Sequence, residues 1–126
     1  MNKQVIETPA APAPIGPYSQ AITIGKMIFV SGQIAIDPST GNLIKGEIKT
    51  ETNQVMENIK AILASGGADF SQVVKTTIYL ADMNQFSAVN EIYGYYFSGN
   101  FPARETVQVA ALPMKANVEI SMIAHL

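Results

Sequence analysis

The 126-residue chain contains no cysteine, no tryptophan and a single histidine, His125. The absence of cysteine excludes a disulfide framework, a thiolate nucleophile and an iron–sulfur site. One histidine is too few for a histidine-rich metal cluster or a histidine-based catalytic triad. Arg104 is the one arginine among eight basic residues, and the other seven are lysines. Much common catalytic chemistry is therefore excluded before any motif is considered.

The chain also has few charges. Charged residues make up 14% of it, whereas about 25% is typical of soluble domains. The net charge is −2 and the lysines are scattered, so the basic stripe that stable nucleic-acid binding requires is missing. No apolar run approaches the ~20 residues of a membrane-spanning helix, and no secretory pattern is present near the N-terminus. We therefore expect a cytoplasmic protein that is partly covered by self-association.

Length predicts one domain over residues 1–126. β-Branched and alternating segments predict strands, and a 3.6-residue apolar period predicts helices. Strands are expected over 3–7, 21–24, 27–36, 73–80, 105–111 and 117–124, and helices over 50–66 and 82–97. The predicted order is β-β-β-α-β-α-β-β, an α+β fold with a mixed sheet of about six strands and two helices on one face.

Local signals support the two helices and the segment before the first hairpin. The first helix carries an apolar stripe that ends at Gly66-Gly67, a suitable C-terminal cap. The second is expected to start at Asp82, with Gln85 reaching back in a capping box. Residues 8–17 hold four of the seven prolines and are predicted to be an ordered, extended lead-in.

Two helices can cover only one face of a six-stranded sheet. The other face is not predicted to be polar, because residues 27–30 and 78–80 are apolar at consecutive positions. An uncovered apolar face of this kind indicates a homo-oligomer.

No GxGxxG, P-loop, GxSxG or metal-binding carboxylate spacing is present, so no phosphate cradle or metal site is predicted. The candidates are polar residues where the pattern expects apolar ones. Arg104 can hold a carboxylate through two parallel hydrogen bonds, or it forms a structural ion pair with Glu105 or Glu119, or it is a solvated loop arginine. Glu119 lies mid-strand between Val118 and Ile120, so it is a functional acid or an ordinary outward residue.

Other candidates are weaker individually. Asn90 falls within the apolar stripe of the second helix, where a buried amide shapes a pocket or ties down a loop. Ser31 and Gly32 interrupt an apolar strand, which indicates a bulge with close backbone approach or a plain strand end. Tyr18 is interpreted as core filler with its hydroxyl at the edge.

Six segments, taken together, resemble the RidA/YjgF family of enamine/imine deaminases. They are IGPYSQ (15–20), VSGQI (30–34), VVKTTIYLADM (73–83), FxxVNExY (86–93), FPAR (101–104) and ALPMKANVEI (111–120). Each segment alone is weakly informative, but the six span nearly the whole chain in the family's order. The resemblance implies a chorismate-mutase-like α+β fold and a homotrimer with its sites in the clefts between subunits.

The resemblance also implies an activity, the hydrolysis of 2-aminoacrylate, 2-iminobutyrate and similar acids to 2-keto acids and ammonia, without metal or cofactor. It places the carboxylate-binding arginine at Arg104, assisted by the backbone N–H of Thr106. The acid that handles water and protons falls on Glu119, and the Gly32 carbonyl is a contact for the departing nitrogen. The remaining substrate-binding positions match Tyr18, Ser31, Gly32 and Asn90. The chemistry fits the residues available, because an imine carbon is already electrophilic.

Two positions depart from the family pattern. Thr106 stands where many relatives have cysteine, which removes thiol-based roles but keeps the backbone N–H. Glu105 stands where a small or apolar residue is usual, and strand alternation predicts that it points away from Arg104. Turned inward, it would compete with the substrate carboxylate, so substrate preference depends on its direction.

Two other functions stay open. An oligomer that binds keto or amino acids in a regulatory or chaperone role needs only Arg104, whereas Arg104 together with Glu119 favours catalysis. Ribonuclease or translation-inhibitor activity is attached to some relatives. The pI near 5.2, the lone arginine and the lack of a basic patch argue against it. The physiological imine and any protein partners are not specified by the sequence.

Overall fold

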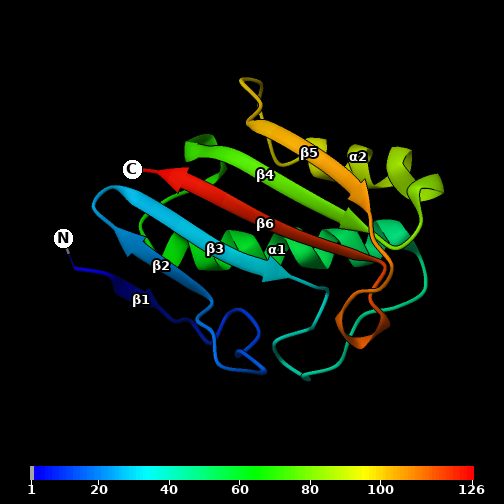
Figure 1. The fold of residues 1–126 in the computed structure, drawn as a ribbon, viewed down its shortest axis with the longest axis horizontal. Coiled ribbons are helices and arrows are strands. Elements are labelled where there is room, and N and C mark those ends of the chain that lie inside the picture. The colour runs from blue at the N-terminus through cyan, green and yellow to red at the C-terminus, as the bar shows by residue number, and fades with distance from the viewer. Residues whose placement is uncertain (1) are drawn as a thin grey trace.

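The computed structural model describes residues 2–126, which form six strands and two α-helices (Figure 1). The strands are β1 (Gln4–Ile6), β2 (Ala21–Ile24), β3 (Met27–Gln33), β4 (Val73–Leu80), β5 (Ala103–Gln108) and β6 (Val118–His125), and the helices are α1 (Ile48–Ser65) and α2 (Phe86–Gly94). Among the described strands the order is β1-β2-β3-β6-β4-β5, antiparallel except for the parallel β4–β5 pair. The predicted element order and the mixed six-stranded sheet are confirmed.

Strand boundaries differ from the predictions by more than one residue in two places. The strand expected over 27–36 ends at Gln33, and the chain then turns so that Ile36 forms an isolated bridge with Leu43. The strand expected over 105–111 begins and ends earlier, at Ala103 and Gln108.

The predicted capping box of the second helix is wrong in part. Asp82 does cap a turn, accepting a 2.9 Å hydrogen bond from the N–H of Asn84, but this turn is a 3₁₀ segment and α2 begins only at Phe86. Gln85 therefore precedes the helix. Its buried side-chain oxygen has no hydrogen-bond partner within residues 2–126. The helix also ends at Gly94, three residues earlier than expected.

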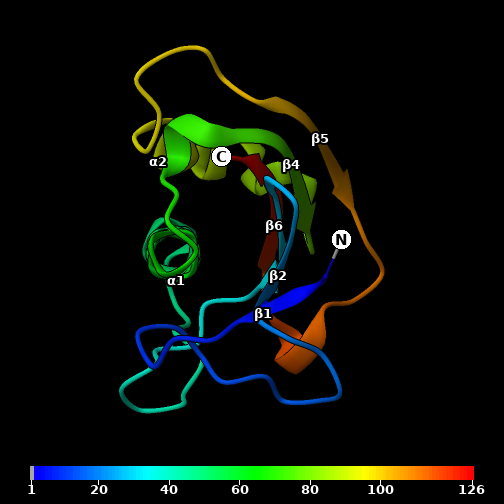
Figure 2. The same ribbon diagram turned by 90° about the vertical axis from the view of Figure 1, so that its left-hand side faces the viewer.

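Figure 2 shows both helices on one side of the sheet, and the hydrophobic core lies between them and that face. The predicted stripe of α1 is fully buried there, and it consists of Val55, Met56, Ile59, Ile62 and Leu63. Alternation along β6 sends its even-numbered residues, Val118, Ile120, Met122 and Ala124, into the same core. The helices therefore decide which face of each strand is buried.

The other face of the sheet carries apolar side chains that neither helix covers. We call it the open face, and its apolar members are Val5, Ile22, Ile24, Met27, Phe29, Tyr79, Val107 and Ile123. Phe29 on the central strand β3 is 40% exposed, and Val107 on the edge strand β5 is 41% exposed. The predicted uncovered apolar face is therefore present.

Glu51, a fully buried residue of α1, holds the start of β6. Its two side-chain oxygens accept 2.8 Å hydrogen bonds from the backbone N–H and the side-chain Nδ2 of Asn117. The carbonyl of Asn117 accepts in turn from the N–H of Ala81 at 3.0 Å, just beyond the end of β4. Since β6 lies between β3 and β4, this contact fixes α1 against the centre of the sheet.

Replacing Glu51 with alanine should lower the free energy of unfolding by about 2–4 kcal/mol, because two partly buried donors of Asn117 lose their acceptor. Glu51→Gln should cost less, since its carbonyl oxygen still accepts from one of the two donors. Urea unfolding followed by circular dichroism measures both. As a control, Glu47→Ala removes an exposed carboxylate one turn earlier and should change stability by less than about 0.5 kcal/mol. A Glu51→Ala loss no larger than the control's would contradict this role.

Candidate functional site

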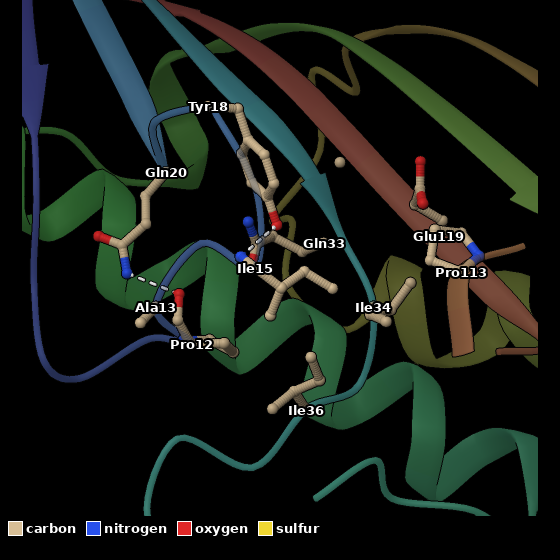
Figure 3. A pocket seen from close by; sticks show the side chains of 11 residues that line it. Pro12, Ala13, Ile15, Tyr18, Gln20, Gln33, Ile34, Ile36, Pro113 and Glu119 are labelled. Atoms are coloured by element: carbon tan, nitrogen blue, oxygen red, sulfur yellow. Dashed lines mark hydrogen bonds between the residues drawn. The ribbon is translucent and has the colours of Figure 1, made fainter. Parts of the chain in front are cut away.

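Five of the seven predicted site residues line two separate cavities. The Glu119 cavity, about 130 Å³, is lined by Tyr18, Gly32 and Glu119 together with apolar residues of the lead-in and of residues 34–36 (Figure 3). The Arg104 cavity, about 320 Å³, is lined by Asn90, Arg104 and the aromatic residues between them. One copy of the chain therefore does not bring the arginine and the acid together.

The two cavities use different faces of the sheet. Arg104 pairs with Thr76, whose side chain is fully buried under the helices, so Arg104 projects toward the helix side of β5. Glu119 pairs with Tyr79 on the open face, as the alternation of β6 requires. Packing thus separates two groups that the resemblance assigns to one site.

Gly32 leaves the space that the carboxyl group of Glu119 occupies. Between Val30 and Gln33 the β3–β6 pairing advances three residues on β3 but only two on β6, which is a bulge. A Cβ atom added at Gly32 would lie 2.5 Å from Oε2 and 2.9 Å from Cδ of Glu119, far inside van der Waals contact. The predicted bulge with close backbone approach is confirmed, and only glycine leaves room for this carboxyl group.

Glu119 itself is half-buried and unpaired. Within the described residues it has neither a hydrogen-bond partner nor a cation within salt-bridge distance, and burial raises the pKa of its carboxyl group. The interpretation as an ordinary outward residue therefore does not account for its surroundings. A half-buried carboxyl group with a raised pKa can both give and take a proton.

Tyr18 and Ser31 connect the lead-in to this cavity. Tyr18 is 48% exposed, so its interpretation as core filler is wrong. Its ring stands at the side of the Glu119 cavity, and its hydroxyl accepts a 3.3 Å hydrogen bond from the N–H of Ile15 (Figure 3). Ser31 lines neither the Glu119 nor the Arg104 cavity. Its hydroxyl donates to the carbonyl of Ser19 at 2.5 Å, which ties the bulge to the lead-in.

Arg104 is held by aromatic rings. Its guanidinium carbon lies 5.1 Å from the centroid of the Tyr93 ring and 5.7 Å from that of Phe86. Tyr93 is fixed in turn, because its hydroxyl hydrogen-bonds to Oγ1 of Thr76 at 3.0 Å in the core. Within residues 2–126 no carboxylate lies within 4 Å of the guanidinium, so the predicted ion-pair alternative is wrong. Cation–π contacts orient the group and leave its hydrogen-bond donors free.

Glu105 points away from Arg104, as alternation predicts. It lies on the open face, where Oε2 accepts a 2.7 Å hydrogen bond from the hydroxyl of Thr77 and Oε1 pairs with Nζ of Lys75 at 3.0 Å. The hydrogen bond from Thr77, followed by the Lys75 interaction, lowers the pKa of Glu105. Glu105 therefore does not compete for the guanidinium.

Thr106 lies on the same side of β5 as Arg104. Its side-chain oxygen is buried without a hydrogen-bond partner in the described chain. The N–H of Val109 donates to the Leu80 carbonyl of β4 at 2.9 Å. Because backbone groups in a parallel pair alternate in direction, the N–H of Thr106 then points to the free edge of the sheet. A backbone donor is therefore available beside the arginine.

Asn90 is half-buried on α2 and lines the Arg104 cavity. Its amide makes no hydrogen bond with any described residue, whereas an asparagine that ties down a loop needs one. Of the two predicted alternatives, the structure favours a pocket residue.

The sequence did not indicate the roles of Gln20 and Glu51, or the cation–π contact between Tyr93 and Arg104. Tyr93 was visible only as a member of an apolar stripe, and Glu51 lies in an otherwise exposed first helical turn. Gln20 had one usable signal, an amide shortly after a proline-rich segment that has few N–H donors.

Along residues 2–126, no helix is long and apolar enough to cross a membrane, and no cluster of three potential metal ligands forms.

The sheet order, with two helices on one face, defines a chorismate-mutase-like α+β protein. The chain belongs to the family whose sequence model is described as Endoribonuclease L-PSP, which matches residues 8–126. The predicted relationship to the RidA/YjgF proteins is thereby confirmed.

Named relatives cover almost the whole chain. The 2-iminobutanoate/2-iminopropanoate deaminase of Mus musculus is 52% identical over 122 residues, which are 97% of this chain and 90% of the mouse protein. YyfA from Yersinia pestis, a protein of unknown function in the Rid family, has a TM-score of 0.97 at 50% identity, covering 99% of this chain and all of YyfA. Escherichia coli TdcF, solved with bound serine, has a TM-score of 0.94 at 38% identity over 98% of both chains.

The raised pKa of Glu119 predicts how stability depends on pH. The folded chain binds this proton more tightly than the unfolded chain does, so the ionised form destabilises the fold as the pH rises through the folded-state pKa. Glu119→Gln removes this effect. Its stability relative to the parent chain should therefore increase from about pH 4 to about pH 7, measured by urea unfolding across that range.

Glu105→Gln is the matched control with the opposite sign. Its folded-state pKa is lowered, so the ionised form stabilises the fold and the benefit is lost as the pH falls. Relative to the parent, Glu105→Gln should become less stable as the pH rises from about 3 to about 5, between the lowered folded-state pKa and the ordinary value. Parallel pH trends for the two variants would contradict the description of Glu119 as buried and unpaired.

Proposed function

We propose that this protein hydrolyses 2-imino acids and their 2-enamine tautomers to 2-keto acids and ammonia. The observation that carries the proposal is Arg104, a guanidinium oriented by two aromatic rings with no carboxylate partner within the described chain. Membership of the family supports it, as does the deaminase name of the mouse relative. Serine bound to TdcF supports a small ligand that carries a carboxylate.

Arg104 binds the substrate carboxylate through two parallel hydrogen bonds, and the outward N–H of Thr106 adds a third. Asn90 offers a free amide at the wall of the same cavity. These contacts fix C2 of the substrate in one orientation, which lowers the entropic cost of attack by water. The reaction itself requires neither a metal nor a cofactor, because the C=N carbon is already electrophilic.

Glu119 moves the protons. It takes a proton from the water that attacks C2 and passes it to the imine nitrogen, which gives the tetrahedral carbinolamine. It then moves the hydroxyl proton of the carbinolamine to the amino nitrogen, so that cleavage of the C–N bond releases ammonia and leaves the 2-keto acid, with one water consumed for each ammonia produced. For an enamine, protonation of C3 and loss of a proton from nitrogen first give the imine. The raised pKa of Glu119 suits a group that must hold a proton and release it in one cycle. The carbonyl of Gly32, beside the carboxyl group, accepts from the departing nitrogen.

The complete site requires a second copy of the chain. The Arg104 cavity and the Glu119 cavity lie on different faces of the sheet, and the open face is apolar and uncovered. A closed homo-oligomer buries the open face and brings the Glu119 cavity of one copy to the Arg104 cavity of the next. The family resemblance gives the number as three. The cytoplasmic location and the single domain remain predictions.

The two alternative functions, a ligand sensor and a nuclease, predict different experimental results. A keto- or amino-acid sensor would bind its ligand at Arg104 without accelerating imine decay. Nuclease activity, suggested by the family's description, is disfavoured by a net charge of −2 and a single arginine. RNA cleavage that survives both further purification and Arg104→Ala would nevertheless establish it.

Arg104→Ala should lower kcat/KM for 2-iminobutyrate by about 100-fold, equivalent to about 3 kcal/mol from two charge-assisted hydrogen bonds. Arg104→Lys keeps the charge but loses the planar fork, and should lower kcat/KM by about tenfold. A threonine dehydratase generates the imine, and scavenger competition follows its decay. Lys60→Ala, on the exposed side of α1, should leave the rate unchanged. Full activity in Arg104→Ala would exclude the assignment, and keto-acid binding without acceleration by the parent chain would favour the sensor.

Mixing two inactive variants tests the shared site. Arg104→Ala and Glu119→Gln chains, unfolded and refolded together, should regain activity, because about a quarter of the sites between random neighbours contain both intact residues. Each variant refolded alone is the control. No recovery in verified mixed oligomers would mean that each site is built within one copy.

A further inference from the structure

The proline-rich lead-in forms a wall of the Glu119 cavity, and Figure 3 shows Pro12, Ala13 and Ile15 on it beside Tyr18. Prolines have no N–H, so a segment rich in them cannot be held by a regular backbone ladder. No strand forms within residues 8–17. The carbonyl groups of this segment therefore need donors from elsewhere.

Gln20 supplies those donors. Its side chain is buried, with the residue only 2% exposed. Nε2 donates to the carbonyls of Pro12 at 2.8 Å and Thr8 at 3.0 Å, and the Ala11 carbonyl, at 3.2 Å, shares one of its two N–H groups. Oε1 accepts from the N–H of Thr8 at 2.8 Å. One amide group thus satisfies both the donor and the acceptor side of the lead-in backbone.

The backbone of Gln20 is joined to the bulge that seats Glu119. Its carbonyl accepts from the N–H of Ser31 at 2.9 Å, and the preceding residue, Ser19, accepts from the Ser31 hydroxyl. Ser31 directly precedes Gly32, against which the carboxyl group of Glu119 lies. Gln20 is therefore bonded both to the lead-in, which forms the wall of the cavity, and to the bulge that contacts Glu119.

We propose that Gln20 is a positioning residue, whose amide holds the lead-in as a preformed wall of the Glu119 cavity and so sets the affinity for substrate. The proposal rests on the proposed function, since it assumes that substrate enters this cavity. Gln20 also lines this cavity, but both polar atoms of its amide are hydrogen-bonded to the lead-in backbone, so it acts through the wall. Without the Gln20 amide, a smaller fraction of molecules has the lead-in in the wall position. If that fraction falls to about one tenth, the apparent affinity for substrate falls about tenfold.

The first test uses amide hydrogen exchange to measure how firmly the lead-in is held, and it requires no catalysis. In the parent protein, the N–H of Thr8 should exchange with solvent much more slowly than that of Ala13, because only Thr8 donates to Gln20. Gln20→Met is nearly isosteric and keeps the packing, but it removes all four hydrogen bonds. In this variant, exchange at Thr8 and Ile15 should accelerate at least tenfold while the core of α1 stays protected. Fast exchange at Thr8 in the parent would overturn the proposal even if the variant did not fold.

The second test separates positioning from catalysis. Gln20→Met should raise KM for 2-iminobutyrate about tenfold and leave kcat within about twofold, because the bound complex is unchanged. Gln20→Glu keeps an acceptor for the N–H of Thr8, but its second carboxylate oxygen faces the three carbonyl groups and repels them. It should therefore raise KM at least as much. Gln4→Met, an exposed glutamine without a side-chain hydrogen bond, is the matched control.

The outcomes distinguish the two proposals. Altered exchange together with an unchanged KM overturns the positioning role and leaves the proposed function standing. A fall in kcat at constant KM also overturns it. If the parent shows no imine hydrolysis, the proposed function fails; affinity for 2-ketobutyrate, measured by calorimetry, then replaces KM. Unchanged keto-acid affinity in Gln20→Met would overturn the positioning role there as well.

Discussion

Two helices cover one face of a six-stranded sheet, and the location of every functional group depends on that one-sided packing. It buries the even-numbered residues of β6 and turns Glu119 to the open face. On β5 it draws Arg104 to the opposite side, against the rings of α2. A sheet covered on both faces would have no open face and no reason to associate. The division of the site between two faces is thus a consequence of how the core is built.

The two charged groups of the site are held without ion pairs. Aromatic rings orient Arg104, and a glycine backbone makes room for Glu119. A conventional salt bridge would fix either group more simply, but it would occupy the hydrogen bonds that a substrate needs. Polar contacts are instead concentrated in the supporting residues. Glu51 anchors β6, Gln20 anchors the lead-in, and Thr76 anchors Tyr93.

Features that follow from local periodicity were predictable from the sequence. The β4 strand, the stripe of α1 and the outward direction of Glu105 all depend on neighbours in the chain. Features that depend on a distant partner were not. The spacing Asp-x-x-Gln occurs at residues 69–72 and 82–85, and only the first closes as a capping box. The two turns lead into different elements, β4 after Gln72 and α2 after Gln85, so identical local patterns have different outcomes.

The sequence by itself determined the chemical inventory, the order of the elements and the face of each strand on which a side chain lies, because composition and a period of 2 or 3.6 residues are local properties. Only the tertiary structure decided that Arg104 is free of carboxylates, that Tyr18 stands at a cavity, and that Gln20 and Glu51 carry buried polar contacts. Such partners are 8 to 66 residues apart in the chain. Their meeting depends on how helices pack on the sheet, which no local pattern encodes.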